Sequence, residues 1–359
     1  MFLFESIPWY SALMWFAVLA GLIIVNELAR INKWFALLIF LVLPVILTFT
    51  VWPNTAGEGS TVGTWFHWAK VYSALAGCLG FLALRHIKGA MNYKYLLFFP
   101  PFILALNILE ACIRDFQVYS FNGMVDGMML VGGPWNIMNG IAGLLNIITI
   151  TGWMGIFISR DKRKDMLWPD MLWFWIIAYD LWNFAYVYNC VPEHAFYAGA
   201  ALLVSCTIPA FFIRKGAWLQ HRAQTLGIWM MFVMCFPSFV DTSMFAVKSS
   251  HSTAALWVVS SLALAANLAV FGYHLYRVVK YKLNPLKDEL YTNLEAYKQV
   301  AYDYRSKDEV RAPVISMIGA SDINLLLDFR LPVFCKLIKI FLCLKKILIT
   351  KFYLEHQNI

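Results

Sequence analysis

A carboxylate and an amide lie three residues apart in a strongly apolar stretch of the chain. Residues 173–189 read WFWIIAYDLWNFAYVYN, where Asp180 is the only charged side chain and Asn183 follows it. Residues three or four apart share a helix face, so Tyr179, Asn183 and Tyr186 would flank this carboxylate in a polar stripe. Such a carboxylate can exchange a proton or hold a cation, and the aromatic rings would add cation–π attraction.

Similar polar residues recur in other apolar stretches and complete a candidate site. Glu110 and Arg114, in LALNILEACIRDF, are four residues apart and can neutralise each other on a helix. A rise of about 1.5 Å per residue from the basic flank places Asp180 and Asp241 about 20 Å deep, just past mid-membrane. Three carboxylates against one arginine would leave surplus negative charge, which a proton, Na⁺ or an organic cation could balance. The candidate ligand-binding residues are Asp180, Asn183, Tyr179, Tyr186, Glu110, Arg114, Asp241, Asn139 and Asn146.

The elements that carry these residues are apolar blocks long enough to cross a membrane. Of the 359 residues, 61% are hydrophobic and 14% charged, whereas soluble domains carry about 25% charged residues. Crossing a hydrocarbon core of roughly 30 Å takes about 20 apolar residues. The sequence therefore predicts an all-α polytopic membrane protein with nine transmembrane helices. The predicted spans are 9–29, 34–52, 69–85, 95–113, 135–158, 167–190, 197–213, 226–247 and 253–276.

The basic residues predict the orientation of these spans. Lys and Arg favour cytoplasmic loops, and they fill alternate loops here, whereas the opposite loops offer only Lys70, Arg114 and Lys248. We therefore expect the N-terminus outside and the C-terminus in the cytoplasm, in a multi-pass protein of the plasma membrane. The net charge of +8 then reflects topology and gives no reason to expect nucleic-acid binding. The first block lacks a basic segment before it, so we expect a retained helix and not a cleaved signal peptide.

Composition divides the chain into three parts. The nine-helix domain would span 1–280, and helical periodicity then predicts a cytosolic amphipathic helix within 281–312. The tail 313–359 is apolar but basic, and a lysine at mid-span costs about 2.5–3.5 kcal/mol, so a tenth crossing is not expected. This tail is either an interfacial basic helix or poorly ordered.

The connector 114–136 is long and rich in glycine, and its GMMLVGG stretch is apolar. Irregular backbone at membrane depth is tolerated where protein or a cavity surrounds it. The connector is therefore either a lid or re-entrant segment over the polar residues, or a surface loop packed on the helix ends.

Motifs for several chemistries are absent from the sequence. There is no H-E-x-x-H for zinc, no G-x-S-x-G elbow, no phosphate-binding loop and no C-x-x-C pair. The sequence thus indicates no metal and no cofactor.

Two resemblances bear on the class of protein. PWNIMNGIAG (134–143) resembles the Trp/Pro-Asn-Gly helix starts of small sugar and vitamin-precursor transporters. The whole chain resembles an uncharacterised bacterial family of multi-pass membrane proteins, which implies no particular activity.

Three functions remain open at this stage. The first is a transport or ligand-binding protein that holds a small polar or cationic solute in a cavity in the outer half of the membrane. The second is a membrane enzyme acting on a lipid or isoprenoid, with Asp180 and Asp241 as acid–base or metal-binding carboxylates. The third is a non-catalytic assembly protein in which the polar residues join helices. The expected partners are the lipid bilayer and a small-molecule substrate; the oligomeric state is undetermined, and we favour a non-enzymatic role.

Overall fold

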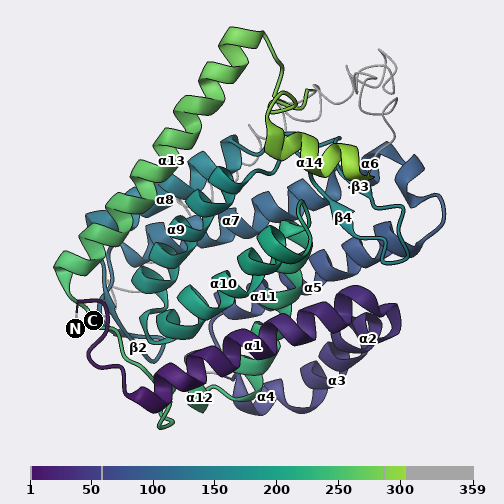
Figure 1. Ribbon diagram of the computed structural model, residues 1–359. Helices are drawn as coiled ribbons and strands as arrows, with labels where there is room; N and C mark the ends of the chain where they lie inside the picture. The colour runs from purple at the N-terminus through teal and green to yellow at the C-terminus, as the bar shows by residue number, and fades with distance from the viewer. Residues whose placement is uncertain (1, 58–59, 286–287, 305–359) are drawn as a thin grey trace, which may run out of the picture. The chain divides into compact units, whose positions relative to one another are not determined.

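The computed structural model describes residues 2–57, 60–285 and 288–304, which are mostly helical (Figure 1). The long helices are α1 (Trp9–Ile31), α5 (Trp65–His86), α7 (Phe99–Val118), α8 (Pro134–Ile148), α9 (Trp173–Cys190), α11 (Trp218–Cys235) and α13 (Thr253–Tyr281). Two further helices are composite. One joins α2 (Lys33–Leu37), a π-helical stretch (Leu38–Val42) and α3 (Leu43–Thr50), and the other places α10 (Leu202–Ile208) between the π-helical stretches Ala195–Ala201 and Pro209–Ile213. The short helices are α4 (Trp52–Thr55), α6 (Lys94–Leu97), α12 (Ser238–Asp241) and α14 (Glu295–Tyr304).

Each predicted apolar block overlaps one of these long or composite helices, but several boundaries were wrong. The block 135–158 stops being helical at Ile148, and the block 167–190 becomes helical only at Trp173. The reason is that residues 149–159 and 165–172 are mostly buried without being helical: Gly152 turns the chain at a φ of +60°, and a small hairpin follows. The block 226–247 corresponds to α11, which begins earlier, at Trp218, and ends at Cys235.

Four helices of the described residues are long and apolar enough to cross a membrane: α1, the composite Lys33–Thr50, the composite Pro192–Ile213, and α13. Large apolar side chains on the first two face outward, and Trp9 and Phe49 are 77% and 79% exposed. Such outward apolar surface suits contact with lipid, because a bilayer interior gives no penalty for exposed hydrocarbon.

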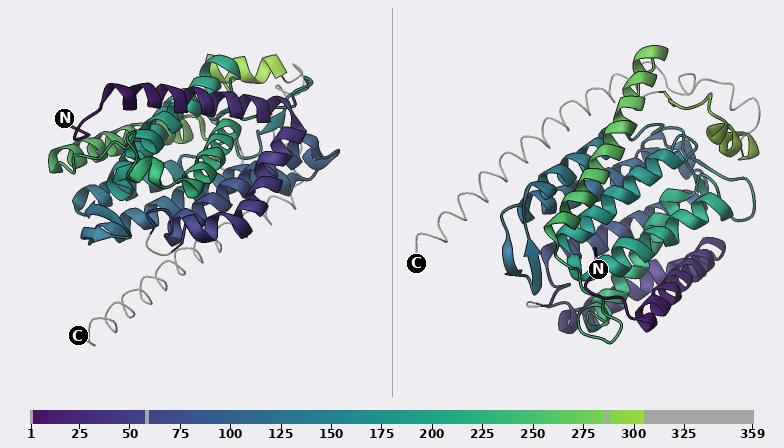
Figure 2. Two further views of the ribbon diagram at one scale, coloured as in Figure 1. Left: turned by 90° about the horizontal axis from the view of Figure 1, so that it is seen from below. Right: turned by 60° about the vertical axis from the view of Figure 1, so that its left-hand side comes forward.

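The long helices pack side by side, and their ends define two ends of the bundle. α13 packs on α8 and α9, α7 packs on α8, and α5 lies between α7 and α11, with α1 against α10 and α11 (Figures 1 and 2). The N-terminal end, where α1 begins, carries α4, α12 and the hairpin of β1 (Asn122–Val125) and β2 (Met128–Val131). The opposite end, here called the basic end, carries α6, α14 and the hairpin of β3 (Phe157–Ile158) and β4 (Met166–Leu167).

The connector 114–136 forms neither a long loop nor a separate re-entrant helix. α7 continues to Val118, and β1 and β2 then pair antiparallel, with Asn122 opposite Val131 and Val125 opposite Met128. Asp126 and Gly127 form the turn with φ of +54° and +74°, values that glycine and aspartate tolerate better than most residues. The hairpin thus explains the glycine content of this segment.

Three arginines at the basic end meet one buried carboxylate. Asp165 is fully buried, and its Oδ2 lies 2.8 Å from Arg30 Nη1 and 2.8 Å from Arg214 Nε. Arg85 Nη2 lies 3.8 Å from Asp165 Oδ1 and also donates to the carbonyl oxygens of Arg30 and Arg163. These arginines, which the sequence indicated only as topology signals, also tie α1, α5 and the end of the second composite helix to the loop 149–172.

The segment after α13 packs on the basic end of the bundle. Asp170 accepts hydrogen bonds from the backbone N–H groups of Leu290 and Tyr291, at 3.0 and 2.9 Å. Arg277 donates to the Leu290 carbonyl oxygen at 3.0 Å. A helix follows at Glu295–Tyr304, inside the predicted range 281–312. Residues 305–359, which include the tail 313–359, lie outside the described residues.

Candidate functional site

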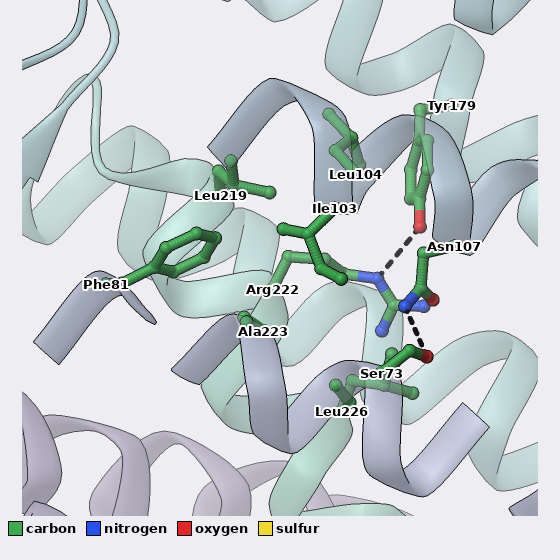
Figure 3. A pocket seen from close by; sticks show the side chains of 12 residues that line it. Ser73, Phe81, Ile103, Leu104, Asn107, Tyr179, Leu219, Arg222, Ala223 and Leu226 are labelled. Carbon is green, nitrogen blue, oxygen red and sulfur yellow. Dashed lines mark hydrogen bonds between the residues drawn. The ribbon is translucent and has the colours of Figure 1, made fainter. Parts of the chain in front are cut away.

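A small cavity lies among α5, α7, α9 and α11. Its volume is about 30 Å³, room for about two water molecules. Ser73, Asn107, Tyr179 and Arg222 supply its polar atoms, and the other walls are apolar side chains such as Phe81. Figure 3 shows the Arg222 guanidinium beside the Tyr179 hydroxyl, Asn107 and Ser73, with Phe81 and Leu219 on the side away from the guanidinium.

The position of this cavity differs from the predicted one. Arg222 lies only about one helical turn after α11 begins at Trp218, and Ile103 is in the first turns of α7. The cavity is therefore nearer the basic end than the N-terminal end, whereas the sequence placed it in the half that belongs to the N-terminal end. Small residues make the space: Gly77 and Ala223 face Ile103, and a methyl group on Gly77 would already touch the Ile103 side chain at 3.8 Å.

Arg222 is the charged group that lines the cavity, and it is 5% exposed. Its Nε donates to the Tyr179 hydroxyl at 3.2 Å, and its Nη2 donates to Asn183 Oδ1 at 3.4 Å. Nη1 is buried and has no hydrogen-bond partner among the described residues. Within the same residues no carboxylate lies within ion-pair distance of this guanidinium, although Asp180 attracts it over a longer range. A buried and incompletely paired cation is costly, so this arrangement calls for an anion.

A network of Lys70, Glu110, Asn107 and Ser73 borders the cavity. Lys70 Nζ lies 3.1 Å from Glu110 Oε2 and donates to Asn107 Oδ1 at 2.8 Å. Ser73 donates to Glu110 at 3.2 Å, and Asn107 Nδ2 donates to Ser73 at 2.9 Å. The ion pair is mostly buried, with side chains 9% and 13% exposed. Because Asn107 and Ser73 also line the cavity, a ligand there would be one hydrogen bond away from this ion pair.

The face of α5 that carries Lys70 and Ser73 is polar back to the N-terminal end. His67 lies one turn before Lys70, is 3% exposed, and has Nδ1 2.8 Å from the Thr64 hydroxyl. The ring centroids of His67 and His194 are 5.7 Å apart. His194 Nε2 lies 3.6 Å from Asp241 Oδ1, and the Asp241 side chain is 20% exposed.

The predicted site residues do not form one cluster. Tyr179 lines the cavity and Asn183 contacts Arg222, but Asp180 does not line it and accepts a hydrogen bond from Thr207 at 2.7 Å. Glu110 pairs with Lys70, so the expected local pair with Arg114 is absent.

Arg114 and Asp241 have partners at the N-terminal end. Arg114 pairs with Asp126 of the hairpin turn at 3.1 Å. Asp241 lies in α12, beyond the end of α11, and accepts a hydrogen bond from Thr61 at 2.7 Å. The carboxylates of Asp180 and Asp241 thus belong to separate surroundings and do not form the acid–base or metal-binding pair of the enzyme hypothesis.

The remaining predicted residues are buried elsewhere between helices. Asn139 Nδ2 donates to Asp115 Oδ2 at 2.8 Å, and Asn136 and Cys190 contact the other oxygen of that carboxylate. The side-chain amide of Asn146 and the hydroxyl of Tyr186 both lack hydrogen-bond partners among the described residues. Asn139 therefore joins α8 to α7, which is the helix-joining role that polar residues often have in membrane proteins.

Sequence reasoning missed Arg222, Lys70 and Asp115. Arg222 was assigned to a loop because the apolar block was taken to begin at 226, and Lys70, at the edge of the block 69–85, was counted with the loops. The i, i+3 spacing of Thr64, His67, Lys70 and Ser73 would have revealed a polar helix face. Among the described residues no group of three or more His, Cys, Asp or Glu side chains could hold a metal ion.

The fold and the cavity define a mostly helical protein with apolar helices that suit a membrane and a buried arginine in its helix bundle. The chain belongs to the family of unknown function DUF5692, whose model matches residues 5–303. No curated protein and no solved structure matches the chain. The family match supports the resemblance to an uncharacterised family and brings no activity with it.

Proposed function

We propose that this chain is an integral membrane transport or ligand-binding protein that holds a small anion in the Arg222 cavity. The observation that carries the proposal is the buried guanidinium, whose Nη1 has no partner among the described residues. Arginine binds carboxylates through two parallel hydrogen bonds, and the Nη1 and Nη2 atoms offer such an edge. Of the polar or cationic solutes expected from the sequence, a cationic one would be repelled by this group.

The walls of the cavity favour a carboxylate with a short apolar part. Phe81, Ile103 and Leu226 line the cavity with hydrocarbon surface, so a methyl or methylene group would lose its water there at no polar cost. A volume of about 30 Å³ limits the occupant in this conformation to a few heavy atoms. Acetate has the required charge and carboxylate geometry and is the smallest carboxylate with a methyl group, so it serves as the reference probe.

The membrane topology is part of the same proposal. The long and composite helices cross the plasma membrane nine times, with the N-terminus outside and the C-terminus in the cytoplasm, as the basic residues predict. The cavity then lies in the cytoplasmic half of the membrane. Outward apolar side chains on α1 and α13, such as Phe16 and Leu262 at 62% and 54% exposure, support contact with lipid.

A thermal-shift experiment tests the anion site. The purified protein is melted in detergent in sodium gluconate, whose anion is too large for the cavity, and gluconate is replaced by acetate, butyrate or chloride at constant ionic strength. A ligand that binds only the folded state stabilises it by mass action and so raises Tm. The free energy of unfolding increases by about 2.7 kcal/mol when the ligand concentration is 100 times Kd. We expect acetate to give a saturable rise.

Two variants locate the effect. Arg222→Gln should abolish the acetate-dependent rise, whereas Arg114→Gln, which removes a buried arginine paired to Asp126 at the N-terminal end, should retain it. A wild-type protein that no anion stabilises, or an Arg222→Gln variant that responds like wild type, would show that the cavity is not an anion site.

A further inference from the structure

Buried titratable side chains lie between the cavity and the N-terminal end. Asp241, partly exposed, lies 3.6 Å from His194, whose ring faces that of His67 with centroids 5.7 Å apart. His67 is followed one turn along α5 by Lys70, which pairs with Glu110 at 3.1 Å. A histidine can receive a proton on one ring nitrogen and release one from the other, so two facing histidines suit proton passage.

Glu110 is the carboxylate that an anion in the cavity would affect most directly. It accepts a hydrogen bond from Ser73, and Ser73 lines the cavity together with Asn107. The cavity and its border hold two cations, Arg222 and Lys70, against the single carboxylate of Glu110. A bound anion pairs with Arg222 but also repels Glu110 through a poorly screened interior. A proton on Glu110 removes that repulsion and frees Lys70 to interact with the anion.

We propose that the cavity takes up its anion together with one proton, which Glu110 accepts and which travels from the N-terminal end through His194 and His67. The inference rests on the proposed function, because it needs an anion beside Arg222. The proton comes from water at the N-terminal end and ends on a carboxylate oxygen of Glu110. The anion and the proton together add no net charge to the buried site.

The surroundings of both groups are compatible with this path. Glu110 is faced by Lys70 from α5, by Tyr186 from α9 and by Arg114 one turn along its own helix, with Arg222 of α11 beyond Lys70. His67 is surrounded by His194, Arg114 and Lys70, and Thr64 holds its Nδ1. In this path His67 passes the proton on and Glu110 accepts it.

Calorimetry measures the coupling directly. Acetate is titrated into the purified full-length protein near neutral pH, in buffers of equal pH but different enthalpies of ionisation. Proton uptake makes the observed binding enthalpy depend on the buffer, with a slope equal to the number of protons bound. We expect about one proton per acetate for wild type, and no buffer dependence for Glu110→Gln, which still binds acetate through Arg222.

Two further variants keep the test decisive. If Glu110→Gln fails to fold because Lys70 loses its partner, the double variant Lys70→Met/Glu110→Gln removes both charges and should bind acetate without proton uptake. His67→Gln should keep the equilibrium uptake but slow it by at least about tenfold, followed by stopped-flow absorbance of a pH indicator. A structural role of His67 alone would leave this rate unchanged.

The outcomes separate this inference from the proposed function. Acetate binding by wild type with no buffer dependence overturns the coupling and leaves the anion site standing. Undiminished proton uptake in both Glu110 variants overturns the assignment of Glu110. Absence of acetate binding by wild type, or unchanged binding by Arg222→Gln, overturns the proposed function, and the inference falls with it.

Discussion

The same substitution at two buried arginines should change stability in opposite directions. Arg222→Gln removes a charge that has no ion-pair partner among the described residues, so the ligand-free protein should become more stable. Arg30→Gln removes a charge that pairs with Asp165 at 2.8 Å and with Glu27 at 2.6 Å, so the protein should become less stable. Both arginine side chains are buried and both helices are retained, which makes the pair a matched comparison.

The expected change in the free energy of unfolding depends on the groups that lose Arg30 or Arg222 as a partner. Removing one member of a buried ion pair costs about 3–5 kcal/mol, which applies to Arg30. Arg222→Gln loses two long hydrogen bonds, at 3.2 and 3.4 Å, each contributing about 0.5–1.5 kcal/mol. Against this stands the relief of burying an unpaired ion, which is several kcal/mol. The expected net gain is about 1–2 kcal/mol, or a few degrees in Tm.

Intrinsic tryptophan fluorescence during heating in detergent measures both changes, with gluconate as the only anion in solution. Arg222→Lys serves as a control, because it retains the buried charge and should gain no stability. If Arg222→Gln lowers Tm as much as Arg30→Gln does, then Arg222 is paired in the folded protein, and the argument for an anion site loses its foundation.

Three more predictions concern the basic end. Asp165→Asn removes the carboxylate that all three arginines share, although Glu27 and Asp161 remain beside Arg30 and Arg214. Because Arg85 then has no carboxylate partner among the described residues, Tm should fall by an amount equivalent to about 3–5 kcal/mol. Burial, and secondarily the charge of Glu289, raise the pKa of Asp170 to about 7 although hydrogen bonds oppose the shift. The folded state therefore holds this proton more tightly than the unfolded state, with its pKa near 4. The stabilisation from this proton is complete below about pH 4 and is lost as the pH rises towards 7. The Tm of wild type should therefore decline across this window, whereas the Tm of Asp170→Asn should not show this decline. Gly216 has a φ of +81°, and an added methyl group would lie 2.5 Å from Val300, so Gly216→Ala should speed proteolysis of the segment 288–304 while Gly21→Ala, with open space around it, should not.

The helices could be predicted from the sequence because a bilayer-sized apolar block almost always forms a helix. Their boundaries could not, because apolar residues can also be buried in irregular backbone. Residues 149–172 show this: Met166 and Trp168 are 1% exposed, yet they lie between α8 and α9 in a segment held by Asp165 and Asp170. Hydropathy reports what is shielded from water and does not distinguish a helix from a packed loop.

The site was harder to predict because cations near helix ends were assumed to face water. The positive-inside rule uses such residues only as a count, and it contains no information on where each side chain points. Arg214 and Arg222 both lie between the predicted spans 197–213 and 226–247, but Arg214 pairs with Asp165 whereas Arg222 lies inside α11. The two arginines differ because α11 begins at Trp218, after Arg214 and before Arg222. The sequence does not mark this helix start with a strong cap.

The arginines at the basic end and Arg222 in the cavity differ in how their charges are compensated, and this difference supports an anion site at Arg222. At the basic end, the carboxylates of Asp165, Glu27 and Asp161, with several carbonyl oxygens, pair with the three arginines Arg30, Arg85 and Arg214. These charges are therefore balanced without a ligand. In the cavity, Arg222 donates long hydrogen bonds to the Tyr179 hydroxyl and to the Asn183 amide oxygen, and its Nη1 has no hydrogen-bond partner among the described residues. A chain that neutralises three buried arginines so thoroughly could have placed a carboxylate at Asn183, the residue that already touches Arg222. An Asn183→Asp variant supplies that missing charge: it should stabilise the protein without ligand, pair with Arg222, and eliminate the response to acetate even though Arg222 is still present.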